Sequence, residues 1–222
     1  MKTNLPILVL ISGNGSNLKA IIKAIRTGLA AEIRAVISNR KDAYGIEWAK
    51  KVGIPTNTIP HGDYPSRTEF ETTLQKMIDH YHPGLVVLDG FMRKLGEDLV
   101  AHYQGRMINI HPSLLPKYTG LNTHERVLAT GDLEHGVSIH YVTKDLDRGP
   151  LICQASLFVT KKDTPKTLSQ RIHILEHILY PQVLSWFAAG RLTLCNQQVW
   201  LDNELLPKTG KRVPISIDQF LI

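Results

Sequence analysis

Leu5-Pro-Ile-Leu-Val-Leu-Ile-Ser12, followed by Gly13-Asn-Gly-Ser-Asn17, is the stretch that predicts how this chain folds. The first eight residues are almost all apolar and show no alternation, which is typical of a strand covered on both faces. Asn17–Arg26 then carries apolar residues at helical spacing, and Gly28 is placed to end that helix. A buried strand, a glycine-rich turn and a helix in this order predict the first unit of a β-α-β fold.

Strand and helix patterns keep alternating as far as Ile110. The further predicted strands are Ile33–Ser38, Thr56–Pro60, Leu85–Asp89 and Arg106–Ile110. The predicted helices between them are Ala43–Lys51, a helix from Ser66 to about Tyr81 with a capping box completed by Glu69, and Leu95–His102. Such alternation implies right-handed crossovers. We therefore predict an α/β, Rossmann-like fold with a mainly parallel, twisted sheet and helices on both faces.

The second half of the chain has a different order of elements. We predict a helix near Thr123–Thr130, strands at Gly136–Val142 and Pro150–Val159, and a long helix from about Thr164 to Ala188. Pro181 predicts a kink or an early end of that helix. The tail from Leu192 shows short strand patterns and turn residues. Because no repeat or linker interrupts the chain, we predict one domain over residues 1–222.

Composition excludes some classes of protein. The net charge is +6, but the basic residues are scattered, and the densest groups, Lys161-Lys162 and Lys208–Arg212, lack interleaved aromatics. A modest positive excess equally suits small anionic substrates such as phosphates and carboxylates, so the charge alone is a weak argument for nucleic acid. Cys153 and Cys195 match no metal or redox spacing, and the N-terminus shows no signal-peptide pattern, so we expect reduced thiols in a cytoplasmic protein. No apolar run approaches the roughly 20 residues that span a bilayer.

Ile108-Asn-Ile-His-Pro-Ser-Leu-Leu-Pro116 is the first candidate for chemistry. Side chains alternate along a strand, so Asn109 and His111 share a face before Pro112 ends the strand. A neutral hydrogen-bond donor beside a titratable imidazole suits the stabilisation of an oxyanion and the movement of a proton. The alternative is a turn with a capping asparagine and a solvated histidine.

The glycine-rich turn Ser12–Asn17 is the second candidate. Gly13 and Gly15 allow the backbone close to a ligand, and the following helix offers free N–H groups. Leu18 occupies the third glycine position of a dinucleotide fingerprint, and Glu32 does not lie where the ribose-binding acid belongs, so a single phosphate fits better. The alternative is a tight turn with an asparagine cap.

Two further motifs remain. The segment Asp145–Pro150 contains two acids, Asp145 and Asp147, which are solvated turn residues in one interpretation. In the other interpretation Asp147 reaches His111 and favours its imidazolium form. His173-Ile-Leu-Glu-His177 matches a zinc-binding spacing with Glu176 as a base, but a third ligand is not evident and we favour a helix face lining a site. The carboxyl ends of parallel strands meet at one edge, so the glycine turn, Asp89–Arg93 and Asn109–Pro116 should converge.

Several of these motifs occur together in one known family. They are Ile11–Leu18, Asp89–Arg93, Ile108–Tyr118, Glu134–Gly136, Asp145–Pro150, Glu176–His177 and Trp186–Arg191. Over roughly residues 5–205 the chain resembles the folate-dependent phosphoribosylglycinamide formyltransferase family of purine synthesis. Asn-x-His before Ser-Leu-Leu-Pro is shared by several formyltransferases, whereas Pro112, Lys117-Tyr118 and the glycine turn indicate the glycinamide ribonucleotide branch.

The resemblance implies a formyltransferase fold and direct transfer of a formyl group from 10-formyltetrahydrofolate, a co-substrate, to the amine of glycinamide ribonucleotide, without a metal. It implies a nucleotide-binding half at about 1–105, a catalytic and folate-binding half at about 106–205, and a tail at 206–222. The implied catalytic residues are Asn109, His111 and Asp147. The ribonucleotide is expected at Gly15, Ser16, Asn17, His173 and Glu176, and the folate at Arg67, Met92, Arg93, Leu95, Asn109, Thr143, Asp145 and Leu146. The expected partners are these small molecules, with no nucleic acid and no membrane, for a monomer or homodimer.

Four residues depart from the family pattern. Asp89, Thr119, Asn122 and Arg148 replace a small residue, a proline, a histidine and a glycine, and we expect them to affect the folate side and loop mobility. The rival functions are a formyltetrahydrofolate deformylase, transfer to initiator methionyl-tRNA, which needs an RNA-binding extension, and a non-catalytic folate or nucleotide sensor.

Overall fold

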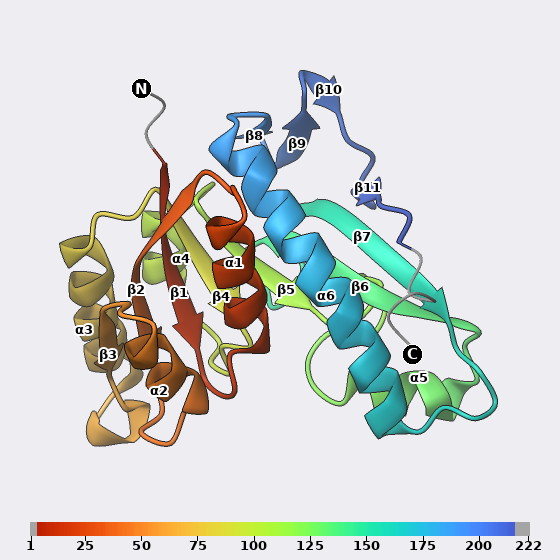
Figure 1. The fold of residues 1–222 in the computed structure, drawn as a ribbon, viewed down its shortest axis with the longest axis horizontal. Helices are drawn as coiled ribbons and strands as arrows, with labels where there is room; N and C mark the ends of the chain where they lie inside the picture. The colour runs from red at the N-terminus through yellow and green to blue at the C-terminus, as the bar shows by residue number, and fades with distance from the viewer. Residues whose placement is uncertain (1–3, 216–222) are drawn as a thin grey trace.

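The computed structural model describes residues 4–215, in which strands alternate with helices (Figure 1). The strands are β1 (Leu5–Ile11), β2 (Ala31–Ser38), β3 (Thr56–Thr58), β4 (Leu85–Asp89), β5 (Met107–His111), β6 (Glu134–Tyr141), β7 (Leu151–Phe158), β8 (Leu192–Cys195), β9 (Gln198–Leu201), β10 (Glu204–Leu205) and β11 (Lys211–Arg212). The helices are α1 (Ser16–Arg26), α2 (Tyr44–Lys51), α3 (Arg67–His80), α4 (Glu97–His102), α5 (Thr123–Thr130), α6 (Pro165–Ala188) and a short 3-10 turn, η1 (His61–Asp63). Every strand and helix predicted as far as Ala188 is present, with ends shifted by a few residues.

One sheet runs through the molecule in the order β11-β7-β6-β5-β4-β1-β2-β3. The five neighbouring strands β5, β4, β1, β2 and β3 are parallel, as predicted from their alternation with helices. After α5 the chain returns as β6, which runs antiparallel to β5, and β7 is antiparallel to β6. The sheet is therefore mainly parallel but gains an antiparallel part where the second half begins. Strands β8 to β10 form a separate small antiparallel sheet.

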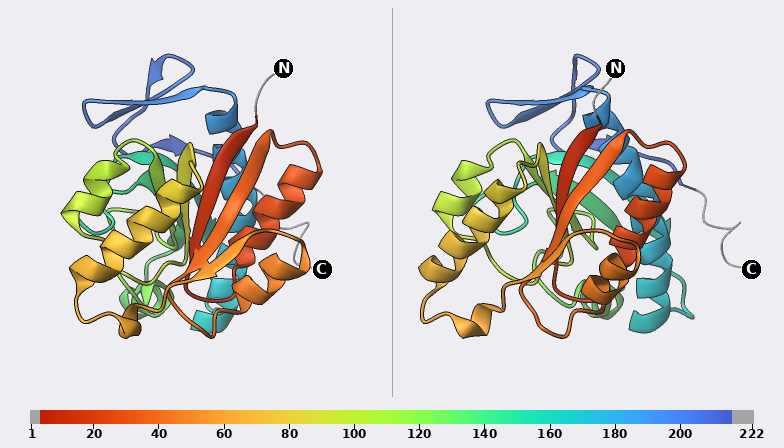
Figure 2. Two further views of the ribbon diagram at one scale, coloured as in Figure 1. Left: turned by 90° about the vertical axis from the view of Figure 1, so that its left-hand side faces the viewer. Right: turned by 60° about the vertical axis from the view of Figure 1, so that its left-hand side comes forward.

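Helices cover both faces of the sheet, as predicted (Figure 2). The alternating side chains of β1 show the division: Ile7, Val9 and Ile11 pack with α1, α2 and α6, whereas Leu8 and Leu10 pack with α3 and α4. These five side chains are fully buried, which explains why β1 is apolar along its whole length. Burial of each such side chain contributes about 1.5–3 kcal/mol, so β1 is a central element of the core.

The long helix α6 runs from Pro165 to Ala188 and does not end at Pro181, so the predicted early end is wrong. Proline leaves the carbonyl four residues earlier without its helical partner, at a cost of about 3 kcal/mol. Leu179, Tyr180, Val183 and Leu184 around the proline are all fully buried against the sheet. This burial offsets the lost hydrogen bond and keeps the helix continuous.

The tail after α6 returns to the sheet. Lys211–Arg212 pairs in parallel with Cys153 and Gln154 at the outer edge of β7. The rest of the predicted 206–222 tail, residues 216–222, lies outside the described residues. Within residues 4–215, no helix combines the length and the apolar character needed to cross a membrane.

Candidate active site

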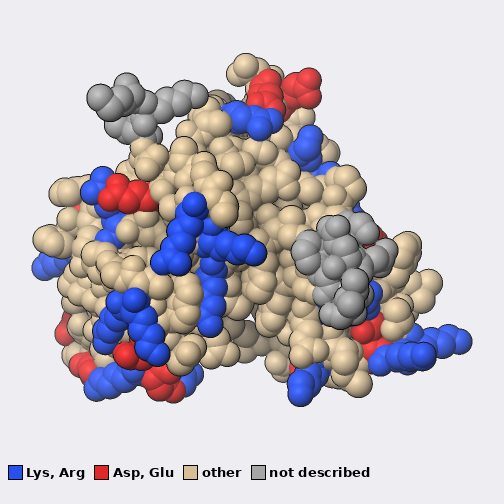
Figure 3. All heavy atoms as spheres, in the orientation of Figure 1, with Lys and Arg blue, Asp and Glu red and all other residues tan. Residues whose placement is uncertain are grey.

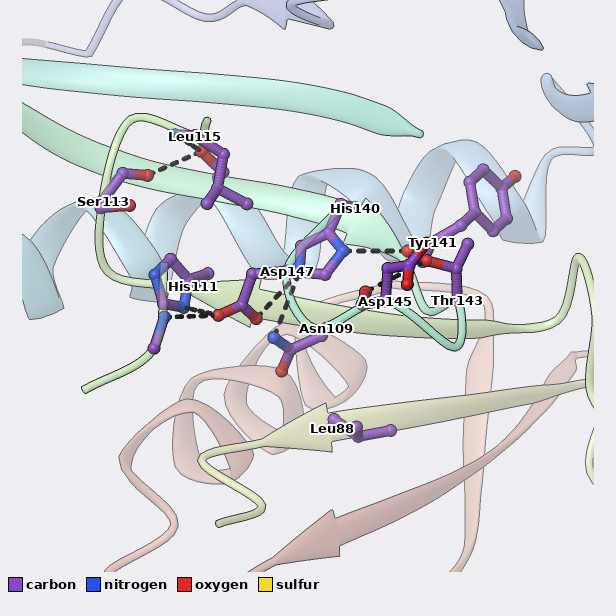
Figure 4. A network of polar contacts seen from close by, with 12 residues as sticks. Leu88, Asn109, His111, Ser113, Leu115, His140, Tyr141, Thr143, Asp145 and Asp147 are labelled. Atoms are coloured by element: carbon purple, nitrogen blue, oxygen red, sulfur yellow. Dashed lines mark hydrogen bonds and ion pairs between the residues drawn. The ribbon is translucent and has the colours of Figure 1, made fainter. Parts of the chain in front are cut away.

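The end of β5 carries two polar side chains that lie side by side (Figure 4). Asn109 pairs across the strands with His140 of β6, and its Nδ2 lies 3.2 Å from His140 Nε2. His140 Nδ1 donates to the Tyr141 carbonyl at 2.9 Å, so Nε2 is the acceptor of the Asn109 amide. Burial lowers the pKa of His140 to about 4, which keeps the ring neutral near pH 7. A neutral imidazole therefore orients the Asn109 amide and leaves its second N–H free to donate.

His111 lies beside Asp147, although the two residues are far apart in the chain. His111 Nδ1 is 3.5 Å from Asp147 Oδ2, and both side chains are buried. The other ring nitrogen, Nε2, donates to the Tyr118 carbonyl at 2.8 Å. Both nitrogens of the ring therefore face oxygen acceptors, the surroundings that an imidazolium needs. The alternative of a solvated side chain is therefore wrong for His111 and Asp147, whereas Asp145 is an exposed turn residue.

The loop that carries Asp147 is held in a strained conformation. Asp147 has a φ of 54°, in the left-handed region that aspartate tolerates better than most residues. Its Oδ2 also accepts the Gly120 N–H at 2.8 Å. At Gly149 an added Cβ would lie 1.7 Å from the Tyr141 carbonyl oxygen, so only glycine fits there. The close approach of the loop to β6 aims the carboxylate at His111.

The segment after His111 rests on a buried polar network from β6 and β7. Ser138 donates to the Ser113 carbonyl and accepts the Leu115 N–H. Gln154 donates to the Leu115 carbonyl and to Ser138 Oγ, each at 2.8 Å. Satisfied buried polar groups give this irregular segment one defined conformation.

The glycine turn joins β1 to α1 and begins the helix at Gly15, whose φ is 65°. Asn17 does not cap the helix: it lies in the first turn, and its Nδ2 donates to Glu176 Oε2 of α6 at 3.0 Å. The alternative of an asparagine cap is therefore wrong. The first N–H groups of a helix have no intrahelical partner, so this turn presents donors and a positive dipole end to an anion.

Hydrogen bonds bring the predicted loops together at one edge of the sheet. Ser12 Oγ donates to Asn39 at the end of β2 and accepts the Met92 N–H at 2.8 Å. Gly45 N–H donates to the Gly13 carbonyl at 3.1 Å, which packs α2 against the glycine turn. The predicted convergence of the glycine turn with the loop after β4 is thus present.

Asp89, which we expected to affect the folate side, contacts the first turn of α1. It ends β4 beside Ile11, and its Oδ2 accepts the Leu18 N–H of α1 at 2.8 Å. Burial raises the pKa of Asp89 to about 6. Burial also raises the pKa of Glu176 to about 7, although the Asn17 amide opposes the shift. Both carboxyl groups lie beneath the glycine turn.

Four further histidines lie in the second half of the chain. His124 Nδ1 is 3.0 Å from His135 Nε2, and burial lowers the pKa of both to about 4. His173 and His177 stack on one face of α6 with ring centroids 6.2 Å apart. In residues 4–215 no group of three or more histidine, cysteine, aspartate or glutamate side chains is placed to hold a metal ion.

The residues expected on the folate side come from the start of α3, the end of β5, the loop after β4 and the loop after β6. Arg67 binds Glu71 at 2.7 Å, and Glu71 accepts the Gly96 N–H, which ties α3 to the loop after β4. Lys144 pairs with Glu97 at 3.0 Å, which ties the start of α4 to residues 143–147. Met92 and Leu146 are exposed apolar side chains, Arg93 and Asp145 are exposed, Thr143 is half-buried, and Leu95 is buried in the core. Leu95 therefore offers mainly its backbone to a ligand.

Of the other departures from the family pattern, Asn122 has a local explanation. The Thr119 carbonyl accepts Arg126 at 2.6 Å, and Asn122 begins α5 with a φ of 57°, a conformation that asparagine adopts readily. Arg148 is exposed. Nothing in the structure explains why arginine stands at position 148.

The sheet, the glycine turn and the Asn-His-Asp group define the class of protein, and comparison with known sequences agrees: the chain belongs to the formyl transferase family, whose pattern matches residues 5–184. The phosphoribosylglycinamide formyltransferase of Escherichia coli K12 is 50% identical over 92% of this chain and 97% of its own length. The structure of phosphoribosylglycinamide formyltransferase from Coxiella burnetii is 69% identical, covers 95% of this chain and 100% of its own, and has a TM-score of 0.93.

A related hydrolase shares the fold. The formyltetrahydrofolate deformylase of Pseudomonas putida has a TM-score of 0.82 but only 24% identity, over 90% of this chain and 71% of its own. At that identity the likeness concerns the fold alone.

Proposed function

We propose that this chain transfers the formyl group of 10-formyltetrahydrofolate to the amine of glycinamide ribonucleotide. The observation that carries the proposal is the convergence of Asn109, His111 and Asp147 at the same sheet edge as the glycine turn. The relatives that are 50% and 69% identical over nearly the whole chain bear the name of this activity.

The reaction proceeds by direct attack. The amine nitrogen forms a bond to the formyl carbon, and the carbonyl electron pair moves to oxygen to give a tetrahedral oxyanion. The free N–H of Asn109 donates to this oxygen, and His111, facing Asp147, donates to it or passes a proton. The bond to N10 of the folate then breaks, and the proton lost by the amine ends on N10. The His111 Nε2–H is the donor available to the substrate. The substrate then replaces the Tyr118 carbonyl as the acceptor of this N–H.

The two substrates approach from opposite sides of this group. The phosphate accepts hydrogen bonds from the N–H groups of Gly15, Ser16 and Asn17. His173 and Glu176 lie along the sugar. The folate lies between the loops that bring together the residues expected for it: Arg67, Met92, Arg93, Leu95, Asn109, Thr143, Asp145 and Leu146. No step calls for a metal.

Both halves of the chain contribute to the site. Residues 1–105 supply the phosphate turn and residues 106–205 the catalytic group, on one continuous sheet, so residues 1–222 act as a single formyltransferase domain. We place the protein in the cytoplasm, where its proposed small-molecule substrates occur, as a monomer or homodimer.

The test is an assay with both substrates, followed by omission of each one. The proposal expects formyl glycinamide ribonucleotide only when both are present. Release of formate at the same rate without ribonucleotide would instead identify a deformylase. If neither formyl glycinamide ribonucleotide nor formate formed, the chain would be a binding protein.

A further inference from the structure

Two carboxyl groups are buried together beneath the glycine turn. Asp89 comes from the end of β4 and accepts the Leu18 N–H at 2.8 Å, and Glu176 comes from α6 and accepts the Asn17 amide at 3.0 Å. Asp89 is 7% exposed and Glu176 is 5% exposed. They bracket the first turn of α1 from below, next to the N–H groups that the turn presents.

Nothing cationic neutralises this pair. No lysine or arginine among residues 4–215 contributes to the pKa of either carboxyl group. Burial is the largest cause of the raised pKa of Glu176, and the negative charge of Asp89 raises this pKa further. The Tyr180 hydroxyl, also on α6, donates to the Leu88 carbonyl rather than to either carboxylate. Burial lowers the pKa of His173 and His177 on the same helix, so these rings are neutral near pH 7. Two like charges this deeply buried cannot both ionise at little cost.

A missing donor points to the same place. The Asn17 side-chain oxygen is buried and has no hydrogen-bond partner among the described residues 4–215. A buried amide oxygen without a donor costs about 1–3 kcal/mol. A proton on either carboxyl group supplies an O–H next to this amide. A proton on the pair is one source of the donor that this oxygen lacks.

We propose that Asp89 and Glu176 share a proton, and that an anion bound on the glycine turn draws this proton into the pair from solvent. The inference rests on the proposed function, which places the ribonucleotide phosphate on the N–H groups of Gly15, Ser16 and Asn17. A phosphate dianion repels two ionised carboxylates directly beneath it, and protonation of the pair removes that repulsion. By linkage, the proton and the anion each increase affinity for the other. Asp89 acts as a positioning residue, because it holds the turn through Leu18 without touching the substrate.

The direct test is the proton uptake on binding, measured by titration calorimetry at pH 7 in buffers of different ionisation enthalpy. Glycinamide ribonucleotide and inorganic phosphate are the two probes. Glu176 has a pKa of about 7 and is half protonated before the anion arrives, so we expect uptake of up to about half a proton beyond the ligand's own change. Above pH 7 the affinity should fall by up to about tenfold per pH unit.

Variants separate this role from a structural one. Asp89→Asn keeps an oxygen that accepts the Leu18 N–H, and we expect it to bind phosphate with reduced uptake and a flatter pH profile. Asp89→Asn combined with Glu176→Gln should leave only the proton change of the ligand itself. Asp98→Asn removes an exposed carboxylate on α4 as the matched control and should retain the full uptake.

Three outcomes decide the matter. Equal uptake in the wild type and the double variant would overturn the inference, because Asp89 would then be only a structural acceptor. A wild-type chain that transfers formyl groups but binds the ribonucleotide without extra proton uptake would overturn it and leave the proposed function standing. A chain that binds neither probe would overturn both.

Discussion

Replacing Asn109 with alanine removes the amide whose free N–H, in the proposed mechanism, donates to the reacting carbonyl. A preorganised donor of this kind contributes about 2.7–4 kcal/mol to the transition state, which corresponds to a loss of about 100- to 1,000-fold in kcat. The same change removes the donor that lies 3.2 Å from His140 Nε2 and leaves this nitrogen of a buried neutral ring without its hydrogen bond. That second effect lowers the free energy of unfolding by about 1–3 kcal/mol.

The two effects are separable by measurement. Turnover with both substrates gives kcat, calorimetry gives the dissociation constant of the ribonucleotide, and denaturant unfolding gives the free energy of unfolding. The dissociation constant should change less than about twofold. Asn57→Ala is the matched control, because the Asn57 amide donates to the Tyr81 hydroxyl at 2.7 Å in a similarly half-buried place on β3. It should lose stability but keep kcat. If Asn109→Ala kept kcat within about threefold of wild type, the assignment of Asn109 as an oxyanion donor would be refuted.

Three further results are expected. Asp147→Asn keeps an acceptor for the Gly120 N–H but removes the charge facing His111, so kcat should fall about 100-fold or more. An unchanged kcat would count against the mechanism. Gly149→Ala places a Cβ against a backbone carbonyl and should lose at least about 3 kcal/mol in denaturant unfolding; an unchanged midpoint would show that the loop adapts. The pKa of Asp89 is about 6 when folded and about 4 when unfolded, so its contribution to stability is lost as pH rises between these values. Asp89→Asn should therefore stabilise the chain relative to wild type more at pH 8 than at pH 5, by a difference of about 1.4 kcal/mol that is visible as a larger rise in Tm, and a pH-independent difference would contradict this.

The parallel half of the fold was predictable because its signals are local. The apolar run of β1, the helical spacing of α1 and the glycine between them each depend on neighbouring residues alone. The position of Asn109 and His111 on one face followed in the same way from the two-residue period of a strand.

Contacts that depend on the pairing of distant segments were not predictable. The antiparallel register that puts His140 opposite Asn109 has no local signal, so His140 was missed as a partner of the site. The contact of Asp89 with α1 was not predicted, because the alternation of a strand does not tell which element lies over its last residue. The reach of Asp147 to His111 depends on the tight approach of Gly149 to β6, which only coordinates reveal.

The short strand β11 has a consequence for the lifetime of the protein in solution. It covers the outer edge of β7, and Val213 N–H donates to the carbonyl of Gln154, whose side chain supports the segment after His111. An uncovered β7 edge is a template for pairing with another chain. We therefore expect that a chain shortened to residue 205 would self-associate and lose catalytic competence together, since one glutamine serves both the edge and the active-site segment.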